Sequence, residues 1–225
     1  MPLKPSGMFI DYLLSETALQ SLKGGDTTAL TAVFSDNAYQ ENEINTIRSE
    51  LKLSTFGFFN GIGQPVSLRK QYSFFPEGAQ VQYILKNDSP FNLSAYFAVE
   101  IDIALAEIDG IIPSLSLYDC EENQKKECGI TTDVFSKISW VQLEDPDGKI
   151  QFTMEANEVP DLITIPVYGI CKTDSGTVEQ RICGVRVFFY WKIDLNPHYE
   201  TEKLLFLKIK SKKTVKAPAA VSHTD

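Results

Sequence analysis

The chain has 225 residues, of which 43% are hydrophobic and 11% aromatic, and its 30 acidic and 21 basic side chains give a net charge of −9. This excess of negative charge repels phosphate backbones and anionic lipids, so we expect no nucleic-acid or membrane partner. Lys, Asp or Glu interrupts every apolar run before it reaches the roughly 18 residues that span a bilayer. The length and composition are typical of one folded domain whose partners are neutral, hydroxyl-rich or apolar.

The N-terminus and the cysteines indicate the compartment. The first residues, Met-Pro-Leu-Lys-Pro-Ser-Gly, lack the apolar segment and cleavage site of a secretory signal, so we expect a cytoplasmic protein. The spacing of the four cysteines matches neither a zinc site nor a redox motif, so we expect reduced thiols and no metal. Cys171 and Cys183 flank a turn-rich segment, and a disulfide across a hairpin is the alternative in an oxidising compartment.

The first predicted element is a short N-terminal helix from Glu16 to Lys23. Ser15 can cap its N-terminus, and Gly24 is positioned to end it in a left-handed conformation. The polar segment 26–46 that follows predicts irregular turns. The remainder of the chain alternates with the period of β-strands, so we expect one short helix in a β protein.

From residue 47 onward, short alternating runs separated by turn residues predict strands. The first four are Leu51–Phe59, Ser67–Phe75, Gln80–Lys86 and Leu93–Leu105. Turn residues at 76–78 and 87–90 separate the last three of these strands. We therefore expect an antiparallel meander.

A polar loop is expected around residues 121–127. Five further strands follow it, at Ile138–Glu144, Ile150–Glu155, Leu162–Ile170, Ile182–Leu195 and Lys203–Ile209. A type I turn at 145–148 joins the first two of them. Residues 211–225 contain few core-forming side chains and are expected to form a disordered tail. The predicted organisation is an N-terminal extension at 1–7 and one domain at 8–210, a large antiparallel β-sandwich of the all-β class.

Two long strands are predicted to have one apolar face each, because side chains alternate across a strand. The odd positions of residues 93–105 are apolar, and so are the odd positions of residues 185–195. We expect both apolar ridges to face the core. The ridge residues are Leu93, Ala95, Phe97, Val99, Ile101, Ile103, Leu105, Val185, Val187, Phe189, Trp191, Ile193 and Leu195.

The opposite faces of these two strands carry aromatic and charged side chains, which we interpret as a candidate carbohydrate-binding set. Its members are Tyr96, Glu100, Asp102, Arg186 and Tyr190. Sugar sites combine flat aromatic rings, which cover C–H patches, with charged groups that bind hydroxyls. The five residues would suit such a site if the two strand faces coincide. The alternative is that they support a second packing layer or a neighbouring domain.

Catalytic groups are scarce in this chain. It has two histidines, His198 in a turn and His223 in the tail, so a Ser-His-Asp triad has almost no material. Glu100 and Asp102 lie about 6.6 Å apart along one strand face, yet no feature of the sequence indicates the raised pKa of an acid catalyst. We therefore assign no catalytic residue and expect no cofactor.

Several short segments occur in an order that carries a family resemblance. They are Phe9–Leu14, Lys70–Tyr72, Val81–Asn87, Phe97–Leu105, Ile165–Tyr168, Ser175–Gly176, Gly184 and Phe189–Pro197. In this order and spacing they resemble the C-terminal β domain of glycoside hydrolase family 57 enzymes, the 4-α-glucanotransferases and related α-amylases. The resemblance extends over residues 8–210.

The resemblance implies a galactose mutarotase-like supersandwich, a fold common among carbohydrate-active proteins. It also implies that the catalytic carboxylates belong to a preceding (β/α)7 barrel, which would be a partner in cis or in trans. The chain has Tyr12 where the family tends to have His, and Cys183 where it tends to have Gln. The domain-contact region and one possible site edge therefore differ from the family pattern.

Three functions remain open. The preferred one is a non-catalytic accessory domain of an α-glucan-processing enzyme, which supports the barrel and binds an α-glucan or oligosaccharide. It requires no catalytic residues and uses both strand faces. The second is a structural protein-interaction module without sugar affinity. The third is a sugar mutarotase or epimerase, which is the least favoured because that chemistry relies on a histidine beside a carboxylate and neither histidine lies in a core strand.

Overall fold

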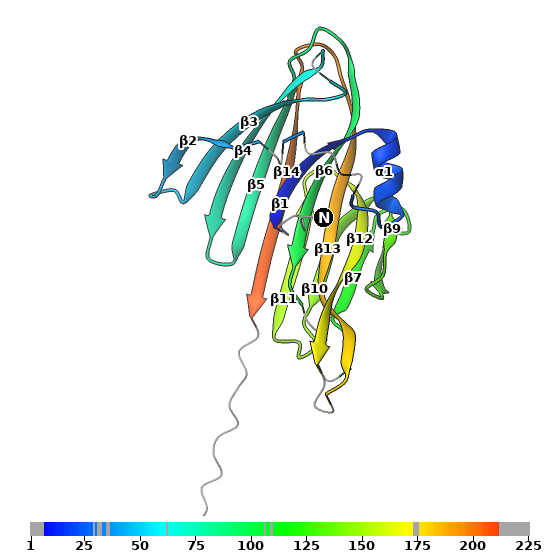
Figure 1. The fold of residues 1–225 in the computed structure, drawn as a ribbon. Coiled ribbons are helices and arrows are strands. Elements are labelled where there is room, and N and C mark those ends of the chain that lie inside the picture. Colours follow the sequence, from blue (N-terminus) through cyan, green and yellow to red (C-terminus); the bar gives the residue numbers. More distant parts are fainter. Residues whose placement is uncertain are drawn as a thin grey trace, which may run out of the picture.

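Two antiparallel β-sheets pack face to face and one short helix covers part of an outer surface, which confirms the predicted β-sandwich (Figure 1). The structure is a computed structural model and describes residues 7–28, 30, 33–34, 37–61, 63–105, 107–108, 110–172 and 176–211. The expected N-terminal extension, apart from Gly7, and the expected tail from residue 212 lie outside the described residues.

The smaller sheet has five strands and contains both of the predicted two-faced strands. Its order is β1 (Met8–Leu14), β6 (Leu93–Ile103), β13 (Val178–Leu195), β12 (Asp161–Lys172) and β9 (Asp133–Phe135). The larger sheet has nine strands. Its order is β2 (Gln40–Asn45), β3 (Glu50–Phe58), β4 (Pro65–Phe75), β5 (Gly78–Asn87), β14 (Glu200–Ser211), β11 (Ile150–Ala156), β10 (Ile138–Glu144), β7 (Ser114–Asp119) and β8 (Gln124–Cys128). All the predicted strands are present, with their ends moved by a few residues.

The helix α1 (Glu16–Lys23) lies at the predicted residues and has the predicted N-cap, since Ser15 Oγ accepts a hydrogen bond from the Ala18 amide at 3.2 Å. The prediction for its C-terminus is wrong by one residue. Gly24 has a φ of −80° and still donates to helix carbonyls, whereas Gly25 has a φ of +83°. The chain reverses at Gly25 because the helical turn continues through Gly24. Within the described residues, no helix has the length and apolar character to cross a bilayer.

The core lies between the two sheets and is organised by the pairing of β6 with β13. These strands run antiparallel from Leu93 opposite Leu195 to Ile103 opposite Val185. Directly opposite residues project from the same face, so both apolar ridges point to the same side. The predicted ridge residues are buried in this core, except that Leu195 is half-buried at its margin.

The predicted meander is correct for β3, β4 and β5 but wrong for β6. The other neighbour of β5 is β14, while β6 belongs to the smaller sheet. Asn87 secures this crossing because its Nδ2 donates to the carbonyls of Phe91 at 2.7 Å, Asn196 at 3.1 Å and Leu195 at 3.2 Å. The turn residues here suit a hairpin as well as a change of sheet, so the local pattern does not distinguish them.

Two strands arise in segments for which the sequence predicts no regular structure. β2 lies in the region of expected irregular turns, and β8 lies in the expected polar loop. Both are edge strands of the larger sheet and are mostly exposed, so they have no apolar face that would produce an alternating pattern. Hydrogen bonds to β3 and β7 define them instead. β1, β7 and β9 are further strands beyond the predicted set.

The four cysteines are free thiols, which agrees with the prediction of reduced thiols. The alternative disulfide between Cys171 and Cys183 is wrong. Across the β12–β13 hairpin Cys171 lies opposite Glu179, whereas Cys183 is the extra residue of a bulge opposite Val167 and Tyr168. The register therefore separates the two sulfur atoms by several residues along the hairpin.

One buried ion pair joins the two sheets. Lys70 on β4 donates from Nζ to Asp11 Oδ2 on β1 at 2.8 Å, and neither residue is more than 4% exposed. The same ammonium donates to the Phe9 carbonyl at 2.7 Å, and the Tyr39 hydroxyl donates to Asp11. Three tyrosine rings have their centroids within 5.3 Å of Nζ, so cation–π attraction offsets part of the desolvation of the charge.

Replacing Lys70 with methionine would leave the Asp11 carboxyl in the core without its cationic partner. We expect Lys70→Met to lower the free energy of unfolding by about 3–5 kcal/mol, the cost of removing one member of a buried pair. Urea denaturation followed by tryptophan fluorescence measures this change. Lys149→Met is the control, because Lys149 pairs with Asp147 on the exposed surface and should contribute less than about 1 kcal/mol. Equal stability of the two variants would contradict the role of the buried pair.

Candidate functional site

The five predicted site residues all lie on the outer face of the smaller sheet, on the adjacent strands β6 and β13. The register places Arg186 directly opposite Asp102 and places Lys192 opposite Tyr96. The two strand faces therefore coincide, as the carbohydrate-site hypothesis requires. Side-chain contacts then divide the set into an ion-pair group and an aromatic group.

The ion-pair group consists of Glu100, Asp102 and Arg186. Arg186 Nε lies 2.9 Å from Glu100 Oε1 and 3.0 Å from Asp102 Oδ1, while Arg186 Nη2 lies 3.3 Å from Asp102 Oδ2. Both carboxylates raise the pKa of Arg186, against the opposing effect of its partial burial. One guanidinium on β13 thus pairs with two carboxylates on the neighbouring strand β6.

Tyr12 completes the ion-pair group from β1. Its hydroxyl donates to Glu100 Oε2 at 2.5 Å, and Glu100 is only 3% exposed. Burial, followed by the charge of Glu100, raises the pKa of Tyr12 well above its usual value, so the phenol stays a proton donor. Tyr12 is not among the site residues that the sequence predicts. One feature of the sequence distinguishes this position, namely that the chain has Tyr12 where the family tends to have His.

The aromatic group consists of Tyr96 and Tyr190, whose rings meet edge to face at a centroid distance of 6.3 Å. Helix α1 contacts both tyrosines. Tyr96 donates to Glu16 Oε2 at 2.6 Å, and Lys23 Nζ lies 5.4 Å from the centroid of the Tyr190 ring. Burial and the nearby carboxylate of Asp161 raise the pKa of Tyr190. Tyr190 is buried in the cluster that α1 forms with the outer sheet face.

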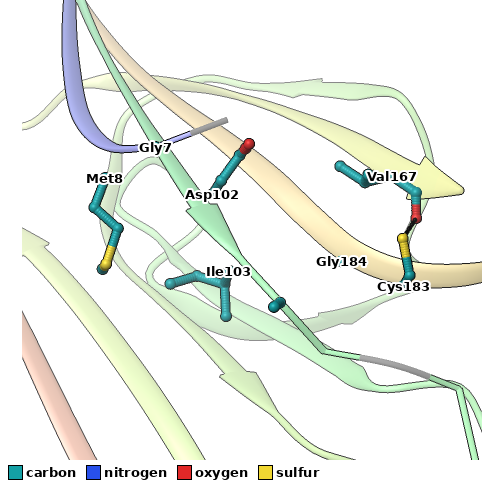
Figure 2. A pocket seen from close by; sticks show the side chains of 8 residues that line it. Gly7, Met8, Asp102, Ile103, Val167, Cys183 and Gly184 are labelled. Atoms are coloured by element: carbon teal, nitrogen blue, oxygen red, sulfur yellow. Dashed lines mark hydrogen bonds between the residues drawn. The ribbon is translucent and has the colours of Figure 1, made fainter. Parts of the chain in front are cut away.

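A cavity of about 380 Å³ opens beside the ion-pair group, at the C-terminal end of β6 and next to Val167 of β12 and Cys183 and Gly184 of β13 (Figure 2). Gly7, Asp102, Val167, Cys183 and Gly184 are among its lining residues. The Cys183 thiol donates to the Val167 carbonyl at 3.4 Å, so it lines the cavity while bonded to the backbone. Asp102 thus belongs both to the ion-pair group and to the wall of an open space.

The chemistry of this face is that of an ion-pair network. Arg186 pairs with both Glu100 and Asp102, and the Tyr12 hydroxyl donates a hydrogen bond to Glu100. His198 lies in the turn between β13 and β14 with a φ of +65°, and the ion-pair group does not include it. Within the described parts of the chain, no group of three His, Cys, Asp or Glu side chains is arranged to hold a metal ion.

Comparison with known proteins identifies the family. Residues 5–202 match the family described as alpha-amylase/4-alpha-glucanotransferase, C-terminal. The chain belongs to this family. The predicted relationship to the C-terminal domain of glycoside hydrolase family 57 enzymes is thereby confirmed. No curated protein sequence matches the chain.

Solved structures share the fold at low sequence identity. The 4-alpha-glucanotransferase from Thermococcus litoralis is 15% identical with a TM-score of 0.66, and the match covers 90% of this chain and 27% of that one. A putative aldose 1-epimerase from Escherichia coli K12 is 11% identical with a TM-score of 0.62, covering 82% and 72%. A galactose mutarotase-like protein from Lactobacillus casei ATCC 334 is 9% identical with a TM-score of 0.59, covering 91% and 82%. The likeness confirms the predicted galactose mutarotase-like fold.

The ion-pair group of this family member can be tested through stability. Arg186→Met would leave two carboxylates side by side without a counter-charge, one of them buried. We expect the free energy of unfolding to fall by about 3–5 kcal/mol. Arg181→Met is the matched control, because Arg181 lies on the same strand and pairs with Glu179 at the surface. The control should change stability by less than about 1 kcal/mol.

Urea denaturation of both variants measures these changes. An Arg186→Met chain that is as stable as the Arg181→Met chain would contradict the assignment of Arg186 as the counter-charge of the outer face.

Proposed function

We propose that this chain is a non-catalytic accessory domain of an α-glucan-processing enzyme and that it supports a (β/α)7 catalytic barrel in cis or in trans. The observation that carries the proposal is the family match over residues 5–202, which concerns the C-terminal part of α-amylases and 4-α-glucanotransferases. The chain corresponds to 27% of the Thermococcus litoralis glucanotransferase, so most of such an enzyme lies outside it.

The non-catalytic part of the proposal is supported by the outer face of the smaller sheet. Glycoside hydrolysis uses one carboxylic acid as a proton donor and a second carboxylate as nucleophile or base. Here both candidate carboxylates, Glu100 and Asp102, bind the same guanidinium. This arrangement favours a structural role for the pair, with the chemistry supplied by the barrel.

Carbohydrate contact at the predicted set remains part of the proposal. Asp102 and Arg186 are partly exposed, and Asp102 lines the cavity, so these two side chains would meet sugar hydroxyls. Tyr96 is half-buried at the edge of α1 and would offer a ring edge. Glu100 and Tyr190 are buried and would act by holding Arg186 and Tyr96 in position.

A structural interaction module without sugar affinity is the second candidate. It is favoured by one specific observation, namely that the charged groups of the outer face bond to one another. Groups whose hydrogen bonds are already made gain less from a sugar hydroxyl than free groups do. The mutarotase alternative lacks such support, because His198 lies in a turn outside the ion-pair group.

The accessory role can be tested with the catalytic barrel of a glycoside hydrolase family 57 enzyme from the organism that encodes this chain, produced as a separate protein. We expect the full chain to co-elute with the barrel in size-exclusion chromatography and to raise its activity on maltoheptaose severalfold, because the barrel alone exposes its domain contact surface. The Escherichia coli aldose 1-epimerase homologue is a fold-matched control that should do neither.

Absence of co-elution together with unchanged barrel activity would contradict the accessory role. A further outcome would replace it: if the chain alone accelerates glucose anomer interconversion above the buffer rate in polarimetry, the mutarotase alternative is correct.

A further inference from the structure

The outer face of the larger sheet carries two adjacent hollows that are separate from the ion-pair group. The first, of about 530 Å³, lies over β3 and β4 near Phe56, and the second, of about 210 Å³, lies over β3, β4 and β5 near Gln71. Arg69 lines both hollows. The two together form one elongated depression, which we call the β3–β4 groove.

Uncharged hydrogen-bonding side chains line part of each hollow of the β3–β4 groove. In the first hollow they are Asn37, Gln40, Ser54 and Ser67. In the second they are Asn42, Gln71 and Gln82. Asn37 Nδ2 already donates to the carbonyls of Val33 and Phe56, and Ser54 donates to Asn42. The amides of Gln40, Gln71 and Gln82 remain to donate to and accept from the hydroxyls of a neutral ligand, without leaving a buried charge.

An exposed aromatic pair stands at one end of the β3–β4 groove. Phe56 lines the first hollow and is 66% exposed, and its ring meets the Phe58 ring edge to face at 6.3 Å. Both project outward, because the alternate residues Thr55 and Gly57 are buried. An aromatic face beside polar groups provides the apolar surface on which the C–H side of a sugar ring can rest.

The charges at the β3–β4 groove are already paired. Arg69 Nη2 lies 2.7 Å from Glu200 Oε2, and Lys52 Nζ lies 2.8 Å from Glu43 Oε2. Each ion pair balances one positive and one negative charge, so the groove attracts neither an anion nor a cation strongly. An uncharged, hydroxyl-rich ligand therefore fits this surface better than a charged one.

We propose that the β3–β4 groove binds a linear α-glucan segment, at a site distinct from the outer face of the smaller sheet. The groove runs along β3 from Phe56 to Lys52, about 13 Å at the rise of a strand, which favours an extended ligand over a compact one. Phe56 covers a sugar ring, and the amide side chains bind hydroxyls further along. The choice of an α-glucan rests on the proposed function, since the groove itself defines only a neutral oligosaccharide.

The test is a titration of the ¹⁵N-labelled full chain with maltoheptaose. We expect amide chemical-shift changes on β3 and β4, and we expect Phe56→Ala to weaken binding about tenfold by removing the apolar platform. Gln71→Ala is a second variant, which should weaken binding by a smaller factor. Phe74→Ala is the matched control. Phe74 is an exposed phenylalanine on β4, but its side chain, like that of Lys70, lies on the opposite face of the sheet from Phe56. The Phe74→Ala variant should bind maltoheptaose with unchanged affinity.

Three results would overturn the proposal. Shifts confined to β6 and β13 would place the glucan on the smaller sheet and leave the proposed accessory function intact. Unaltered β3 and β4 amides with maltoheptaose, combined with changes there on addition of the catalytic barrel, would make the groove a protein contact. An equal response to cellohexaose would refute the α-linked specificity. By contrast, failure of the accessory function appears as absent barrel binding, which the sugar titration does not measure.

Discussion

The antiparallel register of β6 and β13 is the constraint on which the rest of this structure depends. It pairs Leu93 with Leu195 and Ile103 with Val185, so that two apolar ridges enter the core side by side. The same register necessarily places the alternate side chains of both strands together on the outer face. A slip of one residue would expose the core ridge and bury the charges, so the hydrophobic pattern fixes the position of the charged network.

Ion pairing stabilises both the ion-pair group on the outer face and the Lys70–Asp11 pair between the sheets. Arg186 balances Glu100 and Asp102 on the outer face, while Lys70 reaches from the larger sheet to Asp11 on the smaller. Each ion pair offsets part of the free-energy cost of burying a charged side chain. Acids paired in this way stabilise the fold, which agrees with the proposed accessory role.

Long two-faced strands could be predicted from the sequence because burial on one side imposes a strict alternation, as in β6 and β13. The clustering of the five site residues followed from the same alternation. Edge strands such as β2 and β8 could not be predicted, since backbone hydrogen bonds to a neighbour define them. The contact of Lys70 with Asp11, the cover that α1 provides over Tyr190 and the β3–β4 groove depend on tertiary placement, for which local patterns carry no signal.

We infer that the acids of the outer face pair with Arg186 and thereby stabilise the fold. A double-mutant cycle of Arg186→Met and Glu100→Gln, measured by urea denaturation, tests this pairing. We expect the double variant to be more stable than the sum of the single losses implies, with a coupling free energy of about 1–3 kcal/mol. Additive losses would show that the two side chains do not stabilise each other, and the pairing would then not maintain the fold.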